Sequence, residues 1–139
     1  MKRARGASLV EAALVLPLVV LILLGGFEVG RVVNLDETLT NAAREGARWS
    51  AMPAAGTANL PAATAVQARV VAFAAGANLT LDPSAVTVNQ AVSLSEGGLA
   101  TSFSQVDVTY TYSVSTPLVA ALLPTLTLRG HALMRNETN

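Results

Sequence analysis

A single glutamate, Glu11, stands inside the most apolar stretch of the chain. It is the only ionisable residue among the 21 positions from Ala7 to Phe27. A carboxylate costs about 2.5–3.5 kcal/mol at the centre of a bilayer and less near its edge. Glu11 lies four residues after Ala7, which is roughly 6 Å along a helix axis. The cost there is smaller, but a cationic partner is still expected.

The stretch that holds Glu11 is long enough to cross a membrane once. As a helix, 21 residues span roughly 31 Å, against a hydrocarbon thickness of about 30 Å. Three basic residues, Lys2, Arg3 and Arg5, precede it, and Glu28 follows it. Positive charge keeps its own end of a span in the cytoplasm, so the chain after Phe27 is predicted to lie outside the cytoplasm. A conventional signal peptide fits poorly, because the apolar stretch is too long and no clear Ala-x-Ala site follows it.

The N-terminal sequence resembles a type IV prepilin leader. The sequence Met-Lys-Arg-Ala-Arg-Gly6 precedes Ala7-Ser-Leu-Val-Glu11. In that family a membrane aspartyl peptidase cuts after the glycine, and a glutamate stands at the fifth mature position. The stretches 6–17 and 41–48 are similar to the TadE-like branch, the minor pilins or pseudopilins of Tad (Flp) pilus systems. The resemblance covers about the first 50 residues, and a pattern at 126–135 is also similar.

The resemblance implies a processing site and an assembly role. Residues 1–6 would form a leader that is removed between Gly6 and Ala7. The new α-amino group would then pair with Glu11 of a neighbouring subunit, and this pairing would set the axial register of an incoming subunit. The alternative is a glutamate at the membrane interface that contacts water or headgroups. The implied partners are the prepilin peptidase, other pilins and minor pilins, the Tad inner-membrane assembly platform and membrane lipid.

Two weak points interrupt the apolar helix. Pro17 removes the amide that would bond to the carbonyl of Ala13, so we expect a kink or loosening there, and Pro17 is assigned to assembly together with Glu11. Gly25 and Gly26 form a second soft point. By resemblance the helix would partly melt at these glycines on assembly; alternatively, they allow close helix packing in the membrane.

The helical pattern continues beyond the membrane. An apolar stripe recurs at spacings of three and four residues, and polar residues occupy the other faces. The stripe consists of Val32, Leu35, Leu39, Ala42, Gly46 and Trp49. The first helix is therefore predicted over 8–51, with a membrane-spanning first half and an amphipathic second half that the chain's own globular part covers. The domain prediction is a leader at 1–6, a transmembrane helix at 7–28 and an extracytoplasmic domain at 29–139.

The remaining sequence predicts a short helix and a small sheet. A loop at 52–61 leads to a helix at 61–75, with Pro61 at its first position and Gly76 as its C-cap. Its predicted buried face consists of Val66, Val70 and Phe73. Strands are predicted near 85–94, at 106–114 after a turn at 95–99, and at 125–135. Residues 117–124 suit a short apolar helix or loop against the sheet or the membrane surface. The fold class is thus α+β, with an antiparallel sheet of about three strands.

No catalytic, metal or cofactor site is predicted. The chain has no cysteine and one histidine, His131, which we interpret as a surface or packing residue. Neither a phosphate-binding loop nor a nucleophile elbow is present. Two triplets, at Asn78 and Asn136, match the glycosylation pattern and are interpreted as chance matches. Without its leader the chain carries a charge of about −3, which argues against nucleic acid as a partner.

The sequence therefore favours a structural protein over an enzyme. The leading hypothesis is a minor pilin or pseudopilin of a Tad (Flp) system, anchored in the bacterial inner membrane, cut after Gly6 and incorporated by packing of its N-terminal helix. The alternative is an uncleaved, membrane-anchored envelope binding module that does not enter a filament.

Overall fold

The computed structural model describes residues 2–54, 57–96 and 99–137, and the side chains of 2–7, 96, 99 and 118 are not described. The chain divides into two compact units. The first consists of Met1–Val33 and Tyr112–Leu126, and the second of Asn34–Thr111 and Thr127–Asn139. The elements form an α+β fold, as predicted.

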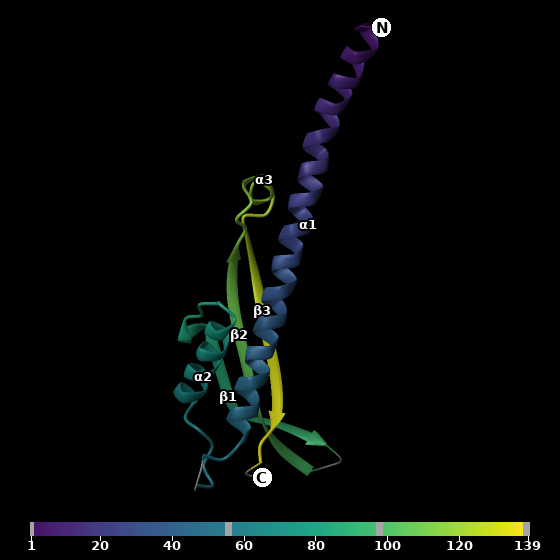
Figure 1. Ribbon diagram of the computed structural model, residues 1–139. Coiled ribbons are helices and arrows are strands. Elements are labelled where there is room, and N and C mark those ends of the chain that lie inside the picture. The colour runs from purple at the N-terminus through teal and green to yellow at the C-terminus, as the bar shows by residue number, and fades with distance from the viewer. Residues whose placement is uncertain (1, 55–56, 97–98, 138–139) are drawn as a thin grey trace. The chain divides into compact units, whose positions relative to one another are not determined.

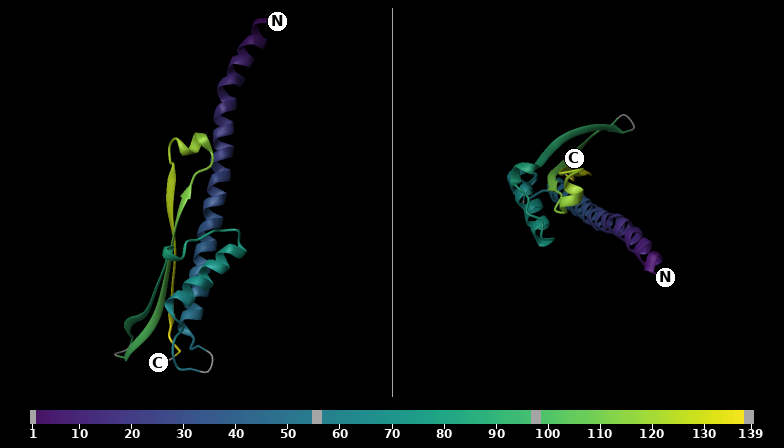
Figure 2. Two further views of the ribbon diagram at one scale, coloured as in Figure 1. Left: turned by 90° about the vertical axis from the view of Figure 1, so that its left-hand side faces the viewer. Right: turned by 90° about the horizontal axis from the view of Figure 1, so that it is seen from above.

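A single helix, α1, covers Lys2–Ala51 (Figure 1). The predicted end at residue 51 is confirmed, whereas the helix begins six residues before the predicted start at residue 8. It continues through Pro17, and its first half curves gently without a sharp break (Figure 2). A membrane helix tolerates proline where other groups satisfy the freed carbonyl. Gly25 and Gly26 are also helical.

The core of the second unit forms around the apolar stripe of α1. Leu39, Ala42 and Gly46 are buried, which confirms that the globular part covers the stripe. At Gly46, a Cβ atom would collide with the side chain of Val70 and lie 3.3 Å from that of Val106. Because these two valines come from α2 and β2, small residues on α1 allow a helix and a sheet to pack closely against it. Figure 2 shows both beside the second half of α1.

The second helix, α2, covers Ala63–Gly76, and two predictions about its ends are wrong. Pro61 lies before the N-cap residue Ala62 rather than at the first helical position, and its carbonyl accepts a hydrogen bond from Gln90. Gly76 is the last helical residue rather than the cap. The left-handed position after the helix belongs instead to Asn78, whose φ is 59°. Asparagine tolerates this conformation because its short polar side chain can hydrogen-bond locally.

The buried face of α2 also differs in one position from the prediction. Val66 and Val70 are fully buried, but Phe73 is 42% exposed and Ala74 is buried in its place. The amide of Leu79 bonds back to the carbonyl of Ala74 at 3.0 Å, and Leu79 is itself buried. The helix therefore ends in a Schellman motif. The apolar contact that accompanies this motif explains why Ala74, rather than Phe73, belongs to the core.

Three strands form one antiparallel sheet in the order β1-β2-β3 (Figure 1). They are β1 Val86–Glu96, β2 Leu99–Ser113 and β3 Thr125–Arg135, and a short turn, η1 Pro83–Ala85, leads into β1. The prediction for β3 is confirmed. Strand β2 starts seven residues before the predicted position, because the polar residues preceding 106 pair with β1 without the alternation that marks the rest of the strand. Residues 97–98 of the predicted turn lie outside the described residues.

A bulge in β1 carries a polar cluster into the core. Two residues, Gln90 and Ala91, stand opposite the single residue Ser104. The Gln90 side chain donates to the hydroxyl of Ser50 at 3.0 Å, and that hydroxyl donates to Ser104 at 3.1 Å. Both serines are fully buried, so these bonds satisfy hydroxyl groups that would otherwise destabilise the core. Asn136, one of the glycosylation matches, is buried beside them and bonds to the Gln90 carbonyl at 2.9 Å.

In the first unit, a short helix, α3, covers Pro117–Ala120 between β2 and β3. Of the predicted alternatives for 117–124, a short apolar helix or a loop, the first four residues form a helix. The amide of Val114 donates to the carbonyl of Pro124 at 3.1 Å, which closes the base of the connection.

Candidate functional site

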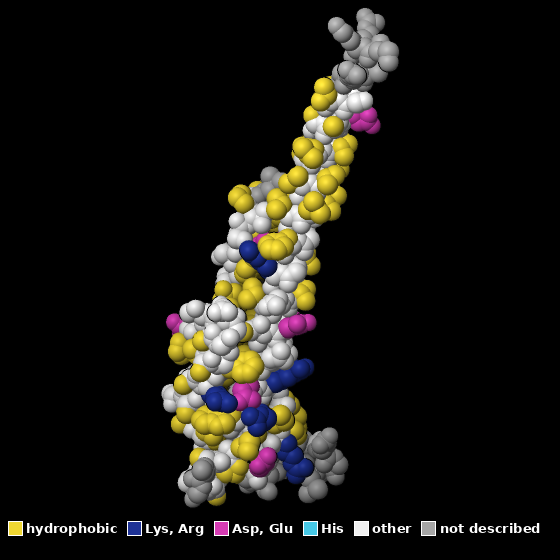
Figure 3. Space-filling model, in the orientation of Figure 1, with side chains coloured by type: hydrophobic (Ala, Val, Ile, Leu, Met, Phe, Trp, Pro, Cys, Tyr) yellow, Lys and Arg dark blue, Asp and Glu magenta, His cyan; other side chains and the backbone are white. Residues whose placement is uncertain are grey.

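The first half of α1 is apolar and exposed. An 18-residue window has a mean hydropathy of 2.5, and none of it is buried. Hydrophobic side chains cover this part of the helix on the face shown in Figure 3. A core helix of a soluble protein would be mostly covered, whereas exposed apolar surface of this extent indicates contact with lipid or with other proteins. The helix is long and apolar enough to cross a membrane.

Glu11 lies on this exposed helix. Its side chain is exposed, and no hydrogen bond or ion pair joins it to any other residue in the part of the chain that the structure describes. The backbones of Gly6 and Ala7 are helical one turn earlier, and their side chains lie outside the described residues. Glu11 is thus available for a partner from outside the chain. Pro17, the other predicted assembly residue, is also exposed.

A second glutamate, Glu28, is buried where the apolar stretch ends. Only 3% of its surface is exposed. One carboxylate oxygen accepts from the hydroxyl of Tyr112 at 2.7 Å and from the amide of Ser115 at 3.2 Å. The other oxygen accepts from the hydroxyl of Thr116 at 3.0 Å. Three donors, one from the end of β2 and two from the β2–α3 connection, therefore hold one carboxylate of α1. Such charge-assisted bonds are stronger than neutral ones.

Arg31 stands one turn after Glu28 and reinforces this cluster. Its guanidinium donates to the hydroxyl of Ser115 at 2.7 Å and lies 4.8 Å from the ring centre of Phe27. The bond to Glu28 and partial burial raise the pKa of the Tyr112 hydroxyl. Tyr112 therefore remains protonated and keeps donating at neutral pH.

Sequence reasoning gave Glu28 only the role of a charge at the end of the span. The signal that was available is local: Tyr112, Ser115 and Thr116 place three donors within five positions, immediately before the apolar segment 117–124. Their common partner lies more than 80 positions away, so the pattern alone does not identify it.

An apolar groove lies beside the Glu28 cluster in the first unit. Its volume is about 330 Å³. On the α1 side it is lined by Gly25, Val29 and Val32, and on the other side mainly by Val119 and Leu123. Because glycine has no side chain, Gly25 leaves this part of the helix surface open to the groove.

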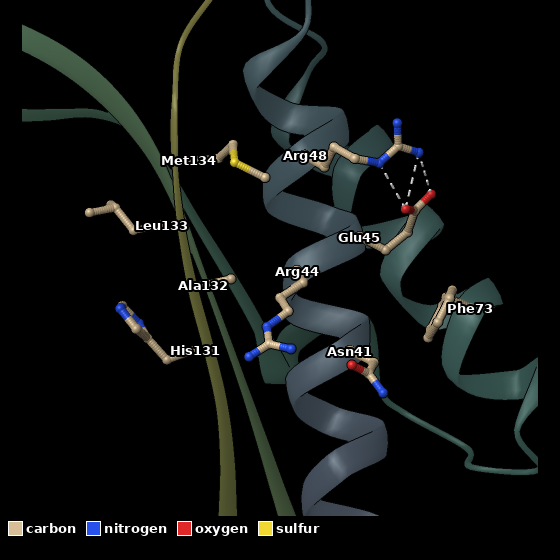
Figure 4. A pocket seen from close by; sticks show the side chains of 9 residues that line it. All are labelled: Asn41, Arg44, Glu45, Arg48, Phe73, His131, Ala132, Leu133 and Met134. Carbon is tan, nitrogen blue, oxygen red and sulfur yellow. Dashed lines mark hydrogen bonds and ion pairs between the residues drawn. The ribbon is translucent and has the colours of Figure 1, made fainter.

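The second unit has an open groove of about 650 Å³ with a basic rim (Figure 4). Glu45 is held by Arg69 of α2 at 2.8 Å and by Arg48 at 3.1 Å. The hydrogen bond from Arg69 lowers the pKa of Glu45, and the bond from Arg48 lowers it further. Burial raises the pKa of Glu45, but by less than these two bonds lower it. Arg44 reaches toward β3 in Figure 4, and no ion-pair partner for it is present among the described residues. This groove could accept an acidic group.

His131 lies on the exposed side of the sheet, as interpreted from the sequence. Its Nδ1 atom is 2.7 Å from a carboxylate oxygen of Asp107, whose other oxygen accepts from Gln105 at 2.7 Å. Burial raises the pKa of Asp107, but the bonds from His131 and Gln105 outweigh it and lower the pKa overall. Within the described ranges, no three His, Asp or Glu side chains come together as a metal site would require.

Taken together, these features define a class of protein with one exposed, membrane-length helix and a small α+β part built on its second half. The family model described as TadE-like protein matches residues 6–48. The resemblance to the TadE-like branch stated from the sequence is therefore confirmed over these residues. No curated protein and no solved structure matches the chain.

Proposed function

We propose that this chain is a minor pilin or pseudopilin of a Tad (Flp) pilus system. One observation carries the proposal: the first half of α1 is exposed and apolar, and its one carboxylate, Glu11, has no partner among the described residues. Such a helix needs an apolar environment and a cation, and a filament of identical helices with free N-termini would supply both. The TadE-like match over 6–48 contains this whole stretch.

In this proposal the precursor waits in the inner membrane with its N-terminus in the cytoplasm and residues 29–139 outside. The prepilin peptidase removes residues 1–6, so that Ala7 becomes the first residue. The amine of Ala7 on one subunit then pairs with Glu11 on the next, which offsets the desolvation of both groups. Partners are other pilin and minor pilin subunits, the assembly platform and membrane lipid.

N-terminal sequencing of the membrane-extracted protein tests the processing step. A start at Ala7 is expected in cells that carry the peptidase, and an intact Met1 is expected in cells that lack it. A Gly6→Phe variant should keep Met1 in both strains. Gly26→Ala is a matched control, because a Cβ atom there meets nothing within 4 Å, and this variant should be cut normally. An intact Met1 in peptidase-positive cells would reject the pilin assignment.

The basic groove of the second unit favours a second candidate, an uncleaved envelope binding module. Arg44 and Arg48 line it together with one acidic residue, Glu45, so an acidic ligand outside the membrane would fit. This candidate predicts that the protein stays in the membrane fraction when surface filaments are sheared off. The pilin proposal predicts that part of it appears in the sheared fraction, provided that it enters the filament rather than only priming it.

A further inference from the structure

The connection between β2 and β3 has an unusual composition for a surface segment. Residues 114–124 contain no charged residue in 11 positions, and valine, leucine and alanine make up seven of them. Connections on a protein surface are ordinarily polar and carry turn-forming residues. The apolar composition therefore indicates that this segment meets something other than water.

The connection is held against α1 at the end of the apolar stretch. The Glu28 carboxylate accepts from the Ser115 amide and the Thr116 hydroxyl, immediately before α3 begins at Pro117. Val119 and Leu123 then line the apolar groove opposite Gly25 and Val29. Figure 1 shows α3 beside α1 at this level. Since Phe27 ends the predicted span, α3 lies where the helix would leave the hydrocarbon.

Two leucines at the tip of the connection are exposed, although Leu123 also lines the groove. Leu122 is 77% exposed and Leu123 is 55% exposed. Phe27 and Val29 of α1 are each 62% exposed in the same unit. These side chains extend the exposed apolar surface of α1 onto a second segment of the chain. Because the two surfaces are continuous, we expect α1 and the connection to meet the same apolar environment.

The amides of residues 119–123 are all paired within the connection. The amides of Val119 and Ala120 both donate to the carbonyl of Thr116, at 3.0 and 2.8 Å. Those of Leu122 and Leu123 both donate to the carbonyl of Val119, at 3.0 and 2.9 Å. Apolar lipid offers no hydrogen bonds, so a segment can enter it only when its amides are already paired. The charge of Glu28 is likewise covered by three donors rather than left facing lipid.

We propose that the tip at 117–123 is a membrane-docking element whose occupant is the lipid bilayer that α1 crosses. Leu122 and Leu123 insert at the boundary between headgroups and acyl chains, as the apolar faces of interfacial helices do. The inference rests on the proposed membrane anchoring by residues 7–27. It adds a second lipid contact and fixes the depth at which Glu28 sits, just beneath the headgroups and shielded by the tip.

The absence of cysteine makes a direct test possible. Three single-cysteine variants of the full chain, Leu122→Cys, Leu18→Cys and Thr87→Cys, are labelled with an environment-sensitive fluorophore and reconstituted into phosphatidylcholine vesicles. Vesicles with nitroxide-labelled lipids report lipid contact at a shallow or a deep position of the acyl chain. Leu18 and Leu122 are exposed apolar residues, and Thr87 is an exposed residue of β1. Each substitution therefore replaces a side chain that the fold does not need.

We expect the label at 122 to be quenched several-fold by shallow nitroxide, the label at 18 to be quenched most by deep nitroxide, and the label at 87 to be unaffected. Quenching at 18 without quenching at 122 overturns the docking element and leaves the anchor in place. Quenching at neither position overturns the anchor itself. An emission shift at 122 that grows with protein concentration but ignores the nitroxide assigns the leucines to another copy of the chain. A label on Ala121→Cys repeats the measurement from an adjacent exposed position.

Discussion

The hydroxyl of Tyr112 donates a 2.7 Å hydrogen bond to the carboxylate of Glu28, 84 positions earlier in the chain. Together with the Ser115 amide and the Thr116 hydroxyl, this contact joins the end of β2 to α1 in the first unit. A carboxylate with three donors resists displacement, because breaking any one bond leaves a charge less well solvated in a site that water scarcely reaches. The cluster therefore orders the connection that carries α3.

The first prediction concerns the order of that connection. Glu28→Ala removes the acceptor of the Ser115 amide, so hydrogen exchange at Ser115 should accelerate by roughly tenfold or more, as expected for loss of a charge-assisted bond. Glu28→Gln keeps one acceptor oxygen and should have a smaller effect. Exchange measured by NMR on the full chain in detergent reports both. Glu37→Ala, which removes an exposed glutamate from the same helix, should leave Ser115 unchanged. Equal protection of Ser115 in all variants would show that the cluster does not order the connection.

The long helix and the strands could be read from the sequence because their signals are local and periodic. The stripe through Leu39, Ala42 and Gly46 repeats at helical spacing, and residues 106–114 alternate as a half-buried strand does. In the structure these three stripe residues are buried, and so are Val106 and Val108 of the strand. The ends of α2 were predicted less well, since Asn78 rather than Gly76 takes the left-handed position, and the choice depends on Leu79 packing against the core.

The contacts of Glu28 could not be read in the same way. Apolar periodicity reports which face of an element is buried, but it does not report which distant donor meets a given carboxylate. Gln90 is a similar case, because its bonds to Ser50 and Pro61 depend on a β-bulge, and no glycine or other turn-forming residue in the sequence predicts that bulge. Glu11 and Gly6, by contrast, are marked by their place between basic residues and an apolar run, so sequence alone singles them out.

The second prediction concerns the close approach of β3 to α1 at Gly130. A Cβ atom at this position would overlap the backbone carbonyl of Leu39 and lie 2.9 Å from the amide nitrogen of Thr40. Backbone cannot move aside as a flexible side chain can, so Gly130→Ala should destabilise the second unit by about 3 kcal/mol or prevent its folding. Urea unfolding followed by fluorescence of Trp49, the only tryptophan, measures the change.

Gly76→Ala serves as the control for this prediction. A Cβ atom there meets nothing within 4 Å, and Gly76 is helical. This variant should be unchanged or more stable by about 0.5–1 kcal/mol, since alanine loses less backbone entropy in a helix. Similar stability of the two variants would contradict the close packing of β3 on α1.

The third prediction is a pH dependence that originates at Glu45. Its pKa lies below its ordinary value of 4.5, mainly because Arg69 donates to it and despite the opposing effect of burial. A lowered pKa in the folded state stabilises the fold above the pKa of the unfolded state, and this stabilisation is lost as the pH falls through the folded value. Arg69→Met should therefore reduce stability by about 0.5–1 kcal/mol at pH 7, in the range of partly exposed ion pairs, and by much less at pH 3.

Thermal unfolding of the wild type and this variant between pH 3 and pH 7 measures the effect. Arg44→Met is the matched control, because Arg44 is on the same helix as Glu45 and forms no ion pair with any described residue. It should leave the pH profile of stability unchanged. A constant difference between wild type and Arg69→Met at every pH would assign the effect of Arg69 to packing of its aliphatic stem rather than to its charge.

The fourth prediction separates the role of Glu11 in assembly from any role in membrane insertion. Glu11→Ala removes a carboxylate from an apolar helix, so insertion should be retained or improved. Incorporation into filaments should fall by at least tenfold, because a neighbouring amine would then be left without its counter-ion in an apolar environment. Membrane fractionation measures insertion, and immunoblotting of sheared filaments measures incorporation. Glu37→Ala removes an exposed carboxylate from the amphipathic half of the same helix and should be incorporated normally. Normal incorporation of Glu11→Ala would indicate that Glu11 is an interface residue in contact with water or headgroups, whereas loss of insertion would show that the residue acts before assembly begins.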